Sequence, residues 1–280
     1  MCALIVMKSF PLYLPMLPES WIVLPTYNEA DNIHGMLDAL RQLPIPLSVL
    51  VVDDNSPDGT AEIVRGYQKA YPDFRVELLS RTKKEGLGRA YEAGFRWVLE
   101  NTTAEHIYEM DADFSHPPEY LPKLAEALKT ADMAIGSRYI QGINVVNWPL
   151  SRILLSYGAS WYVRFVAGMP VKDPTAGFVG YRRWLLERIL AAGPIRFRGY
   201  AFQIEMKYKA FLAGAKLVEV PIVFVERVAG QSKMSRQVIQ EAIWGVLWLR
   251  WRRAKLRAAL TAPATPTETS VVPNAPAQSA

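Results

Sequence analysis

Two carboxylates one residue apart, Asp111 and Asp113, come directly after an apolar stretch that begins at Ile107. Side chains two positions apart on an extended chain leave it on the same side, so both carboxylates can reach one ion. Divalent ions such as Mg²⁺ bind these oxygens and keep positions open for phosphate oxygens. An Asp-x-Asp tripeptide alone is usually a solvated turn, but Pro117 and Pro118 follow it in a pattern typical of a helix start. The sequence therefore predicts a metal and diphosphate site at the end of a strand.

Three earlier apolar runs, at residues 21–25, 47–52 and 75–80, alternate with helix-like segments. This alternation predicts an α/β unit, with a mostly parallel sheet, over about the first 137 residues. Ligands bind such sheets beyond the carboxyl ends of the strands. Polar residues gather after each run, namely Glu29, Asp53, Asp54, Asp58, Arg81, Lys83 and Lys84. Together with the Asp111 segment they predict a nucleotide site, whereas we interpret Asn28 and Asp58 by themselves as turn and cap residues.

Composition and missing motifs exclude several other classes. The 280 residues, 50% apolar, suffice for a full core, and a single cysteine, Cys2, excludes a disulfide framework and fits a reducing compartment. A net charge of +5, from 32 basic and 27 acidic residues, argues against a general nucleic-acid binder. The chain has no glycine-rich dinucleotide motif, no phosphate loop and no nucleophile elbow. His34, His106 and His116 lack metal-ligand spacing, so we expect structural roles for them.

The second half of the chain differs in composition, with aromatic and basic residues within its apolar segments. Residues 147–166 are apolar and aromatic with arginines near helical spacing, which fits a membrane-interface helix and a core helix equally well. Residues 236–258 combine a Trp-rich apolar pattern with a basic end, which favours an amphipathic helix on an anionic membrane surface. No uninterrupted apolar run reaches the roughly 20 residues that a bilayer requires. We expect an N-terminal arm at 1–19, a catalytic domain at 20–235, this helix, and a disordered tail at 259–280.

Four segments, at residues 25–29, 51–60, 110–118 and 230–233, resemble the dolichol- or polyprenol-phosphate mannose synthases. These are inverting family-2 glycosyltransferases with a GT-A fold, a Rossmann-like, mostly parallel sheet flanked by helices. The resemblance runs in order over about residues 20–255. It implies GDP-mannose as donor, Mg²⁺ or Mn²⁺ as metal, and a polyprenyl or dolichyl phosphate as acceptor. It also implies a peripheral enzyme on the cytoplasmic face of a membrane, with small membrane subunits as further candidate partners.

The resemblance also assigns residues to roles. Donor contacts would come from Pro25, Tyr27, Glu29, Val52, Asp54, Asp111 and Asp113. The metal would lie on Asp111, Asp113 and Ser115, the last standing where many relatives have Gln. The cations expected at the donor and acceptor phosphates are Arg138, Arg152, Arg227 and Lys233. Of all these, Asp113, Arg138, Arg227 and Lys233 are the candidate catalytic residues.

Charge distinguishes the possible reactions. A phosphate monoester has a second pKa of about 6 and is largely dianionic at neutral pH, so as a nucleophile it needs no general base. A hydroxyl acceptor needs a carboxylate base, for which Glu205 and Asp173 are candidates, and UDP-glucose remains an alternative donor. A catalytically silent nucleotide-sugar-binding subunit is a third reading, which the acidic and basic residues named above disfavour. The loop around Gly230 is interpreted as a lid over an anion or as a solvated basic turn.

Overall fold

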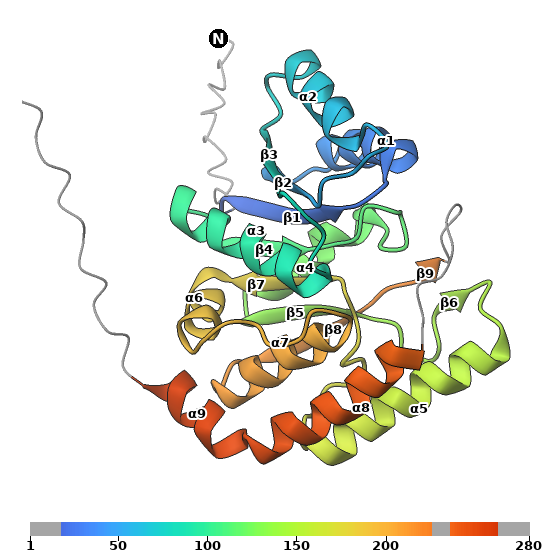
Figure 1. Ribbon diagram of the computed structural model, residues 1–280, viewed down its shortest axis with the longest axis vertical. Coiled ribbons are helices and arrows are strands. Elements are labelled where there is room, and N and C mark those ends of the chain that lie inside the picture. Colours follow the sequence, from blue (N-terminus) through green and yellow to red (C-terminus); the bar gives the residue numbers. More distant parts are fainter. Residues whose placement is uncertain (1–17, 226–235, 263–280) are drawn as a thin grey trace, which may run out of the picture.

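The computed structural model describes residues 18–225 and 236–262, which form a seven-stranded sheet with helices on both faces (Figure 1). The strand order is β3-β2-β1-β4-β7-β5-β8, and only β7 runs antiparallel to its neighbours. The strands of this sheet are β1 (Ser20–Thr26), β2 (Leu47–Asp53), β3 (Val76–Ser80), β4 (His106–Glu109), β5 (Met133–Ser137), β7 (Val179–Arg182) and β8 (Leu217–Pro221). A second, two-stranded parallel sheet pairs β6 (Val145–Val146) with β9 (Phe224–Val225).

Helices cover both faces of the large sheet because its central strands carry apolar side chains on both faces. In β1, Trp21 and Val23 belong to one buried cluster, and Ile22 and Leu24 belong to the other. Such continuous apolar runs are typical of parallel strands buried on both faces. On one face pack α1 (Ala30–Arg41), α2 (Thr60–Ala70) and α4 (Leu121–Leu128), the last preceded by a short 3-10 turn, η1 (Pro118–Tyr120). On the other pack α3 (Leu87–Asn101), α6 (Arg183–Ala191) and α7 (Ala201–Leu212).

Helix α3 approaches the sheet closely at a glycine. A Cβ atom added to Gly94 would collide with the side chain of Val23 on β1, and it would lie 3.0 Å from a methyl group of Val52 on β2. The helix therefore lies low over these two strands. As a result, the residues that precede α3 lie near the carboxyl ends of β1 and β2.

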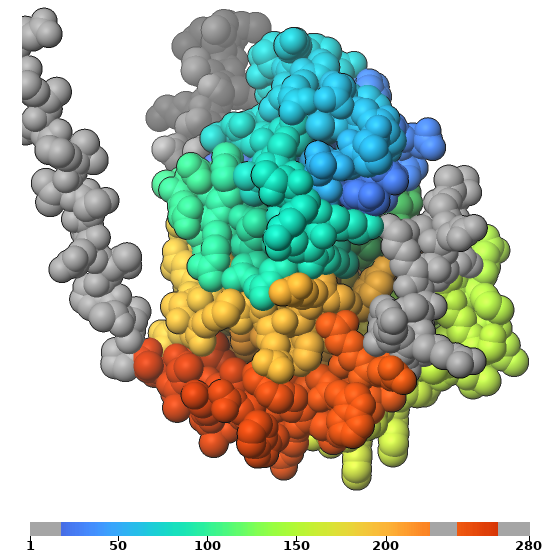
Figure 2. All heavy atoms as spheres, viewed as in Figure 1, coloured from blue at the N-terminus to red at the C-terminus, as the bar shows by residue number. Residues whose placement is uncertain are grey.

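An outer layer consists of α5 (Leu150–Ala167), α8 (Arg236–Trp251) and α9 (Arg253–Thr261). Helix α8 contacts both α5 and α7, and α9 contacts α7. Figures 1 and 2 show these three helices along one edge of the molecule, in lime for α5 and orange-red for α8 and α9. Val246, Leu249 and Leu260 are buried there against the core, so this layer is integral to the fold.

The predicted α/β class and mostly parallel sheet are confirmed. The single helix expected at 236–258 is instead two helices that break at Arg252 and end at Thr261, so the first residues of the expected tail are helical. The rest of that tail, from residue 263, and residues 1–17 of the expected arm lie outside the described residues. Within residues 18–225 and 236–262, no helix has the length and apolar character needed to cross a membrane.

Candidate functional site

The carboxyl ends of β1, β2 and β4 lie beside one another because these three strands are parallel neighbours. The hydroxyl of Thr26, the last residue of β1, donates a 2.9 Å hydrogen bond to the carboxylate of Asp53, the last residue of β2. The same carboxylate accepts hydrogen bonds from the backbone and side chain of Ser56. Asp53 therefore fixes the turn after β2 to the end of β1, at the edge where a parallel sheet binds ligands.

Two basic residues, Arg81 and Lys84, lie beside the carboxyl ends of β1 and β2. The guanidinium of Arg81 forms an ion pair with the buried carboxylate of Asp54 and a second, at 2.9 Å, with Glu85. Burial raises the pKa of Asp54 above its ordinary value, against the opposing effect of Arg81. The ammonium of Lys84 lies 3.6 Å from the ring centre of Tyr27. Asp54 and Tyr27, both expected at the donor, thus come together with two cations from the basic cluster predicted at this edge, although neither cation was assigned a donor contact.

The segment from Asn28 to Thr60 confirms the expected turn and cap roles. Asn28 has a left-handed backbone with φ of 59°, which Asn tolerates in turns. Asp58 accepts hydrogen bonds from the backbone of Ala30 and from the backbone and hydroxyl of Thr60. The backbone N–H of Glu29 donates to the Thr60 hydroxyl at 3.1 Å. These bonds join the start of α1 to the start of α2 and keep the backbone of Glu29 beside the site.

Of the remaining donor candidates, Pro25 is a half-buried residue of β1. Val52 is fully buried in the core below α3. The Val52 side chain therefore faces the core, and a donor contact at this position would have to use its backbone.

The Asp111 segment is held from three sides. The backbone N–H of Asp111 donates to Nδ1 of His116 at 3.1 Å, and the hydroxyl of Tyr91 on α3 lies 3.4 Å from the Asp111 carboxylate. Asp113 accepts a 3.0 Å hydrogen bond from the backbone of Ser115. The ring of His116 stacks on Phe178. His116, expected to be structural, does anchor the loop, but it also lines the cavity described below.

The donor set of this segment consists of hard oxygens. In the described parts of the chain, no group of three or more His, Cys, Asp or Glu side chains is arranged to hold a metal ion. Two carboxylates, Asp111 and Asp113, are nevertheless present, and the buried hydroxyl of Ser115 has no hydrogen-bond partner among the described residues. Two carboxylates and one hydroxyl fit a divalent ion that takes its other ligands from phosphate oxygens and water.

Two charged side chains lie fully buried behind this segment. Glu109 ends β4, and burial raises the pKa of its carboxyl well above the ordinary value. Lys207 of α7 is also completely buried, and burial lowers the pKa of its ammonium. The Lys207 ammonium donates to the backbone carbonyl of Ala176 at 2.6 Å and to the side-chain oxygen of Gln203 at 3.0 Å. Sequence patterns alone did not select either residue, because both lie within apolar elements.

A cavity of about 640 Å³ begins at this segment and extends into the outer layer. Its polar end is lined by Asp111, Ser115, His116, Arg138 and Gln203. Its apolar end is lined by α5 and α8, through residues that include Leu154, Leu155, Tyr162, Ala242 and Ile243. The cavity thus extends from the Asp111 carboxylate, beyond the end of β4, to the space between α5 and α8.

Arg152 and Arg138, two of the predicted phosphate-binding cations, line this cavity. The guanidinium of Arg152 lies 4.0 Å from the ring of Trp148, and that of Arg138 lies 5.6 Å from the same ring. Phe224, on β9 of the two-stranded sheet, packs against Trp148. Arg227 and Lys233, the other two predicted cations, lie outside the described residues, as does the interpreted lid around Gly230.

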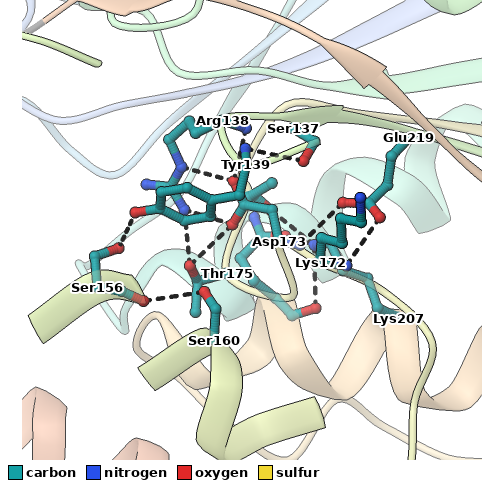
Figure 3. Close-up of polar contacts among 12 residues, drawn as sticks. Ser137, Arg138, Tyr139, Ser156, Ser160, Lys172, Asp173, Thr175, Lys207 and Glu219 are labelled. Atoms are coloured by element: carbon teal, nitrogen blue, oxygen red, sulfur yellow. Dashed lines mark hydrogen bonds and ion pairs between the residues drawn. The ribbon is translucent and has the colours of Figure 1, made fainter. Parts of the chain in front are cut away.

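Arg138 is not an isolated cation. Its Nε and Nη2 atoms donate to the two carboxylate oxygens of Asp173 at 2.7 and 2.6 Å, and its backbone N–H donates to the same carboxylate (Figure 3). Burial alone would raise the pKa of Asp173, but the charge and hydrogen bonds of Arg138 lower it below the ordinary value. Asp173 is therefore the counterion of Arg138, not the free base that a hydroxyl acceptor requires.

Glu205, the other candidate base, is also committed to other partners. Its carboxylate accepts hydrogen bonds from the backbone of Arg196 and Phe197 and forms a 2.9 Å ion pair with Lys209. Both Glu205 and Lys209 are almost completely buried. Among the described residues that line the cavity, Asp111 is the only acidic one.

The sequence and fold are similar to those of known glycosyltransferases. The undecaprenyl-phosphate mannosyltransferase of Micrococcus luteus is 45% identical over 85% of this chain and 98% of its own length. The polyprenol monophosphomannose synthase of Mycolicibacterium smegmatis is 44% identical over 80% of this chain and 86% of its own length. A Pyrobaculum calidifontis mannosyltransferase, solved with GDP-Man and Mn²⁺, has a similar fold, with a TM-score of 0.51 at 20% identity over 86% of this chain and 74% of its own.

The family model "Glycosyl transferase family 2" matches residues 21–190, which run from the second residue of β1 to beyond β7. This match covers more than half of the chain, and it agrees with the identities to the two bacterial relatives. The resemblance inferred from the four sequence segments is thereby confirmed. The chain belongs to the glycosyltransferase family 2.

Proposed function

We propose that the protein transfers mannose from GDP-mannose to a polyprenyl phosphate, with inversion at the sugar carbon. The observation that carries this proposal is the cavity, which is polar at Asp111 and apolar between α5 and α8. A lipid phosphate has the same two-part character. The names of the two bacterial relatives, which specify mannose and a polyprenyl phosphate, support the same substrates.

The donor would lie across the carboxyl ends of β1, β2 and β4. Tyr27, Glu29 and Asp54 are suited to the nucleoside, with Pro25 and the backbone of Val52 beside them. Arg81 and Lys84 add positive charge on this side. Guanine rather than uracil, and mannose rather than glucose, follow from the resemblance and the relatives. UDP-glucose therefore remains the alternative donor with which GDP-mannose must be compared.

A divalent ion, Mg²⁺ or Mn²⁺, would be held by Asp111 and Asp113, with Ser115 as the third candidate ligand. Its chemistry would be to neutralise the charge that develops on the diphosphate leaving group. The Mn²⁺ in the Pyrobaculum calidifontis structure supports the same choice of ion. The chain's own residues supply the anchoring, since Tyr91, His116 and the backbone of Ser115 hold the two carboxylates in position.

The acceptor phosphate would enter beside Arg138 and Arg152, with Arg227 and Lys233 as further candidate cations. Two anions must approach each other in this reaction, so guanidinium groups on the path offset their repulsion. The phosphate is already anionic near neutral pH, so the nucleophile needs no base. The engagement of Asp173 with Arg138 and of Glu205 with Lys209 supports a phosphate acceptor over a hydroxyl acceptor.

The enzyme would act as a peripheral protein at the cytoplasmic face of a membrane, docked through α5 and α8. Exposed apolar side chains form a stripe along α5, made of Leu150, Leu154, Tyr157, Trp161 and Phe165. A shorter stripe on α8 consists of Trp244, Leu247 and Trp251. The two helices pack against each other at one edge of the molecule (Figure 2). They carry exposed Arg164 and Arg250, and the following helix α9 carries exposed Arg257. Aromatic side chains beside basic ones are typical of surfaces that bind anionic lipids.

The test is transfer of radiolabelled sugar to a short polyprenyl phosphate in detergent, from GDP-mannose and in parallel from UDP-glucose, with and without Mn²⁺. We expect a mannosylated lipid that requires the metal and depends on the phosphate, with free polyprenol as the control acceptor. Preferential glucosyl transfer would change the donor assignment. A product formed on polyprenol, but none on its phosphate, would overturn the acceptor assignment.

A further inference from the structure

Arg138 is held by a chain of contacts that begins at the edge of the sheet. Glu219 lies on β8, the edge strand, and its two carboxylate oxygens accept hydrogen bonds from the backbone N–H groups of Lys172 and Asp173 at 2.8 and 2.9 Å. The Asp173 carboxylate in turn accepts hydrogen bonds from Nε and Nη2 of Arg138 (Figure 3). Glu219 thereby fixes the backbone from which the Arg138 counterion projects.

The hydrogen bonds leave one part of the Arg138 guanidinium available. Nε and one hydrogen of Nη2 point to Asp173, and Nη2 also donates to the Thr175 hydroxyl at 2.7 Å. Within the described parts of the chain, Nη1 makes no side-chain hydrogen bond. Arg138 lines the cavity, and its side chain is only 10% exposed. Its remaining donors are therefore the two N–H groups of Nη1, in a fixed direction.

The neighbouring Tyr139 extends this chain of contacts to the outer layer. Its hydroxyl donates to the Ser156 hydroxyl on α5 at 2.8 Å, and Ser156 also lines the cavity. The Arg138–Tyr139 segment is thus held between β8, which is part of the sheet, and α5, which forms the cavity wall. A cation held in this way loses little freedom when an anion binds, so its contact is preorganised.

We propose that Glu219 and Asp173 are positioning residues that orient the Nη1 group of Arg138 toward a phosphate oxygen at the polar end of the cavity. The inference rests on the proposed function, because it takes the anion to be a phosphate. That phosphate belongs to the lipid acceptor or to the nucleoside diphosphate, and the two sources offer the same chemistry to Nη1. Asp173 also neutralises most of the charge of Arg138, so this residue contributes direction more than long-range attraction.

The test begins with Glu219→Gln, which keeps the size of the side chain but turns an N–H group toward one backbone N–H. Glu77→Gln is the matched control, since Glu77 lies on β3, the opposite edge strand of the same sheet. We expect Glu219→Gln to lower transfer by about tenfold, as misplacement of a catalytic group does. Glu77→Gln should leave it unchanged, and both variants should melt near the wild-type temperature.

The source of the phosphate is read from two binding measurements. A higher KM for the polyprenyl phosphate, with an unchanged Kd for GDP and Mn²⁺, assigns the contact to the acceptor. A weaker GDP complex assigns it to the donor. The GDP measurement needs no transfer, so a wild-type enzyme that fails to mannosylate the lipid overturns the proposed function without deciding this inference. If Glu219→Gln changes neither quantity, the positioning role is overturned.

A double-mutant cycle separates positioning from general stability. In an Arg138→Lys background the side-on pair with Asp173 cannot form, so Glu219→Gln should add less than about a twofold further loss. If the loss from Glu219→Gln is the same in both backgrounds, Glu219 acts without Arg138 and the proposal is wrong. Asp173→Asn provides a second check that leaves Arg138 in place, and it should reproduce the change in KM or Kd that Glu219→Gln causes.

Discussion

Asp111 and Asp173 both lie near the polar end of the cavity, yet they are used in opposite ways. The Asp111 side chain is 24% exposed and lines the cavity, whereas the Asp173 side chain is 0% exposed and paired with Arg138. Asp111 follows the end of a central parallel strand, and Asp173 precedes the antiparallel strand β7. Asp111 thus presents its carboxylate to the cavity, whereas Asp173 uses its carboxylate to hold a cation.

The comparison extends to the other acidic residues of the second half. Glu205 is paired with Lys209, and Glu219 binds two backbone N–H groups. This arrangement suits an acceptor that brings its own negative charge, since a free carboxylate beside it would repel it. Under the proposed function, this difference between Asp111 and the buried acidic residues of the second half would reflect the two substrates, a donor that binds with a metal and an acceptor that needs positive charge.

The largest expected effect is the loss of metal-dependent transfer in Asp113→Ala, which tests the carboxylates that follow β4. Removing one of the two carboxylates proposed to hold the metal should lower Mn²⁺-dependent transfer by about a thousandfold, the size expected for losing several kcal/mol of transition-state stabilisation. The measurement is mannosyl transfer over a range of Mn²⁺ concentrations. Glu62→Gln, a change at an exposed carboxylate on α2, is the control. Full activity of Asp113→Ala would rule out the metal assignment.

The next effect concerns the exposed stripe of the second half. Trp161 and Phe165 on α5 are 62% and 76% exposed and stack on each other, so replacing both with Ser should not open the core. We expect binding to anionic vesicles to weaken about a hundredfold, from about 1.4 kcal/mol lost at each site. Vesicle co-sedimentation measures this, and the Kd for GDP should not change.

The control for this pair is Trp184→Ser on α6, a 40% exposed tryptophan outside the stripe. Vesicle binding as strong as that of the wild type in the α5 double variant would place the membrane contact elsewhere. Deleting residues 236–280 is a poorer experiment, because Val246, Leu249 and Leu260 are part of the core. That deletion would weaken the fold together with the membrane contact.

A smaller effect is expected at Arg81, which pairs with Asp54 on the donor side. Burial raises the pKa of Asp54 and Arg81 opposes this, so Arg81→Gln should raise that pKa further and leave the carboxylate poorly oriented. We expect the Kd for GDP to rise about tenfold, as for loss of a hydrogen bond to a charged group. Calorimetry at neutral pH measures it, with Arg65→Gln, at an exposed ion pair on α2, as the control. Unchanged GDP binding would separate Asp54 from the nucleotide site.

The two halves also differ in how much the sequence reveals. Asp53, Asp54, Asp111 and Asp113 follow apolar runs directly, so strand periodicity and turn residues were enough to place them at one edge of the sheet. The antiparallel β7 and the pairing of Asp173 with Arg138 depend on contacts between residues 35 apart in the chain. No local pattern predicts such a pair. For the same reason sequence reasoning left Glu205 and Asp173 as candidate bases.

Residues 147–166 show the same limit. Their composition fitted an interface helix and a core helix equally, and α5 combines both. Ser160, Val163 and Ala167 are buried, whereas the stripe that contains Trp161 and Phe165 is exposed. Which face is covered depends on α8, which begins 69 residues after the end of α5 and packs against it. Periodicity defines the faces of a helix but not the neighbour that covers them.

The smallest effect on activity is expected at His106, at the amino end of β4, the strand whose carboxyl end leads to Asp111. Burial and, to a lesser extent, Arg182 lower the pKa of His106 from 6.5 to about 4. As pH falls from 6.5 to 4, the unfolded chain takes up a proton that the folded protein excludes. The free energy of unfolding should therefore decrease, by up to about 3 kcal/mol over that interval. Denaturant melts at several pH values measure this loss.

His106→Asn removes the titrating group, so its stability should change less than that of the wild type between pH 6.5 and 4. Transfer at neutral pH should stay near the wild-type rate, because His106 lies at the end of β4 opposite the site. His34→Asn is the control, since His34 is exposed on α1 beside Asp38. If His106→Asn retained the full acid sensitivity of the wild type, another group would be responsible. If it lost transfer with its stability intact, the amino end of β4 would also contribute to function.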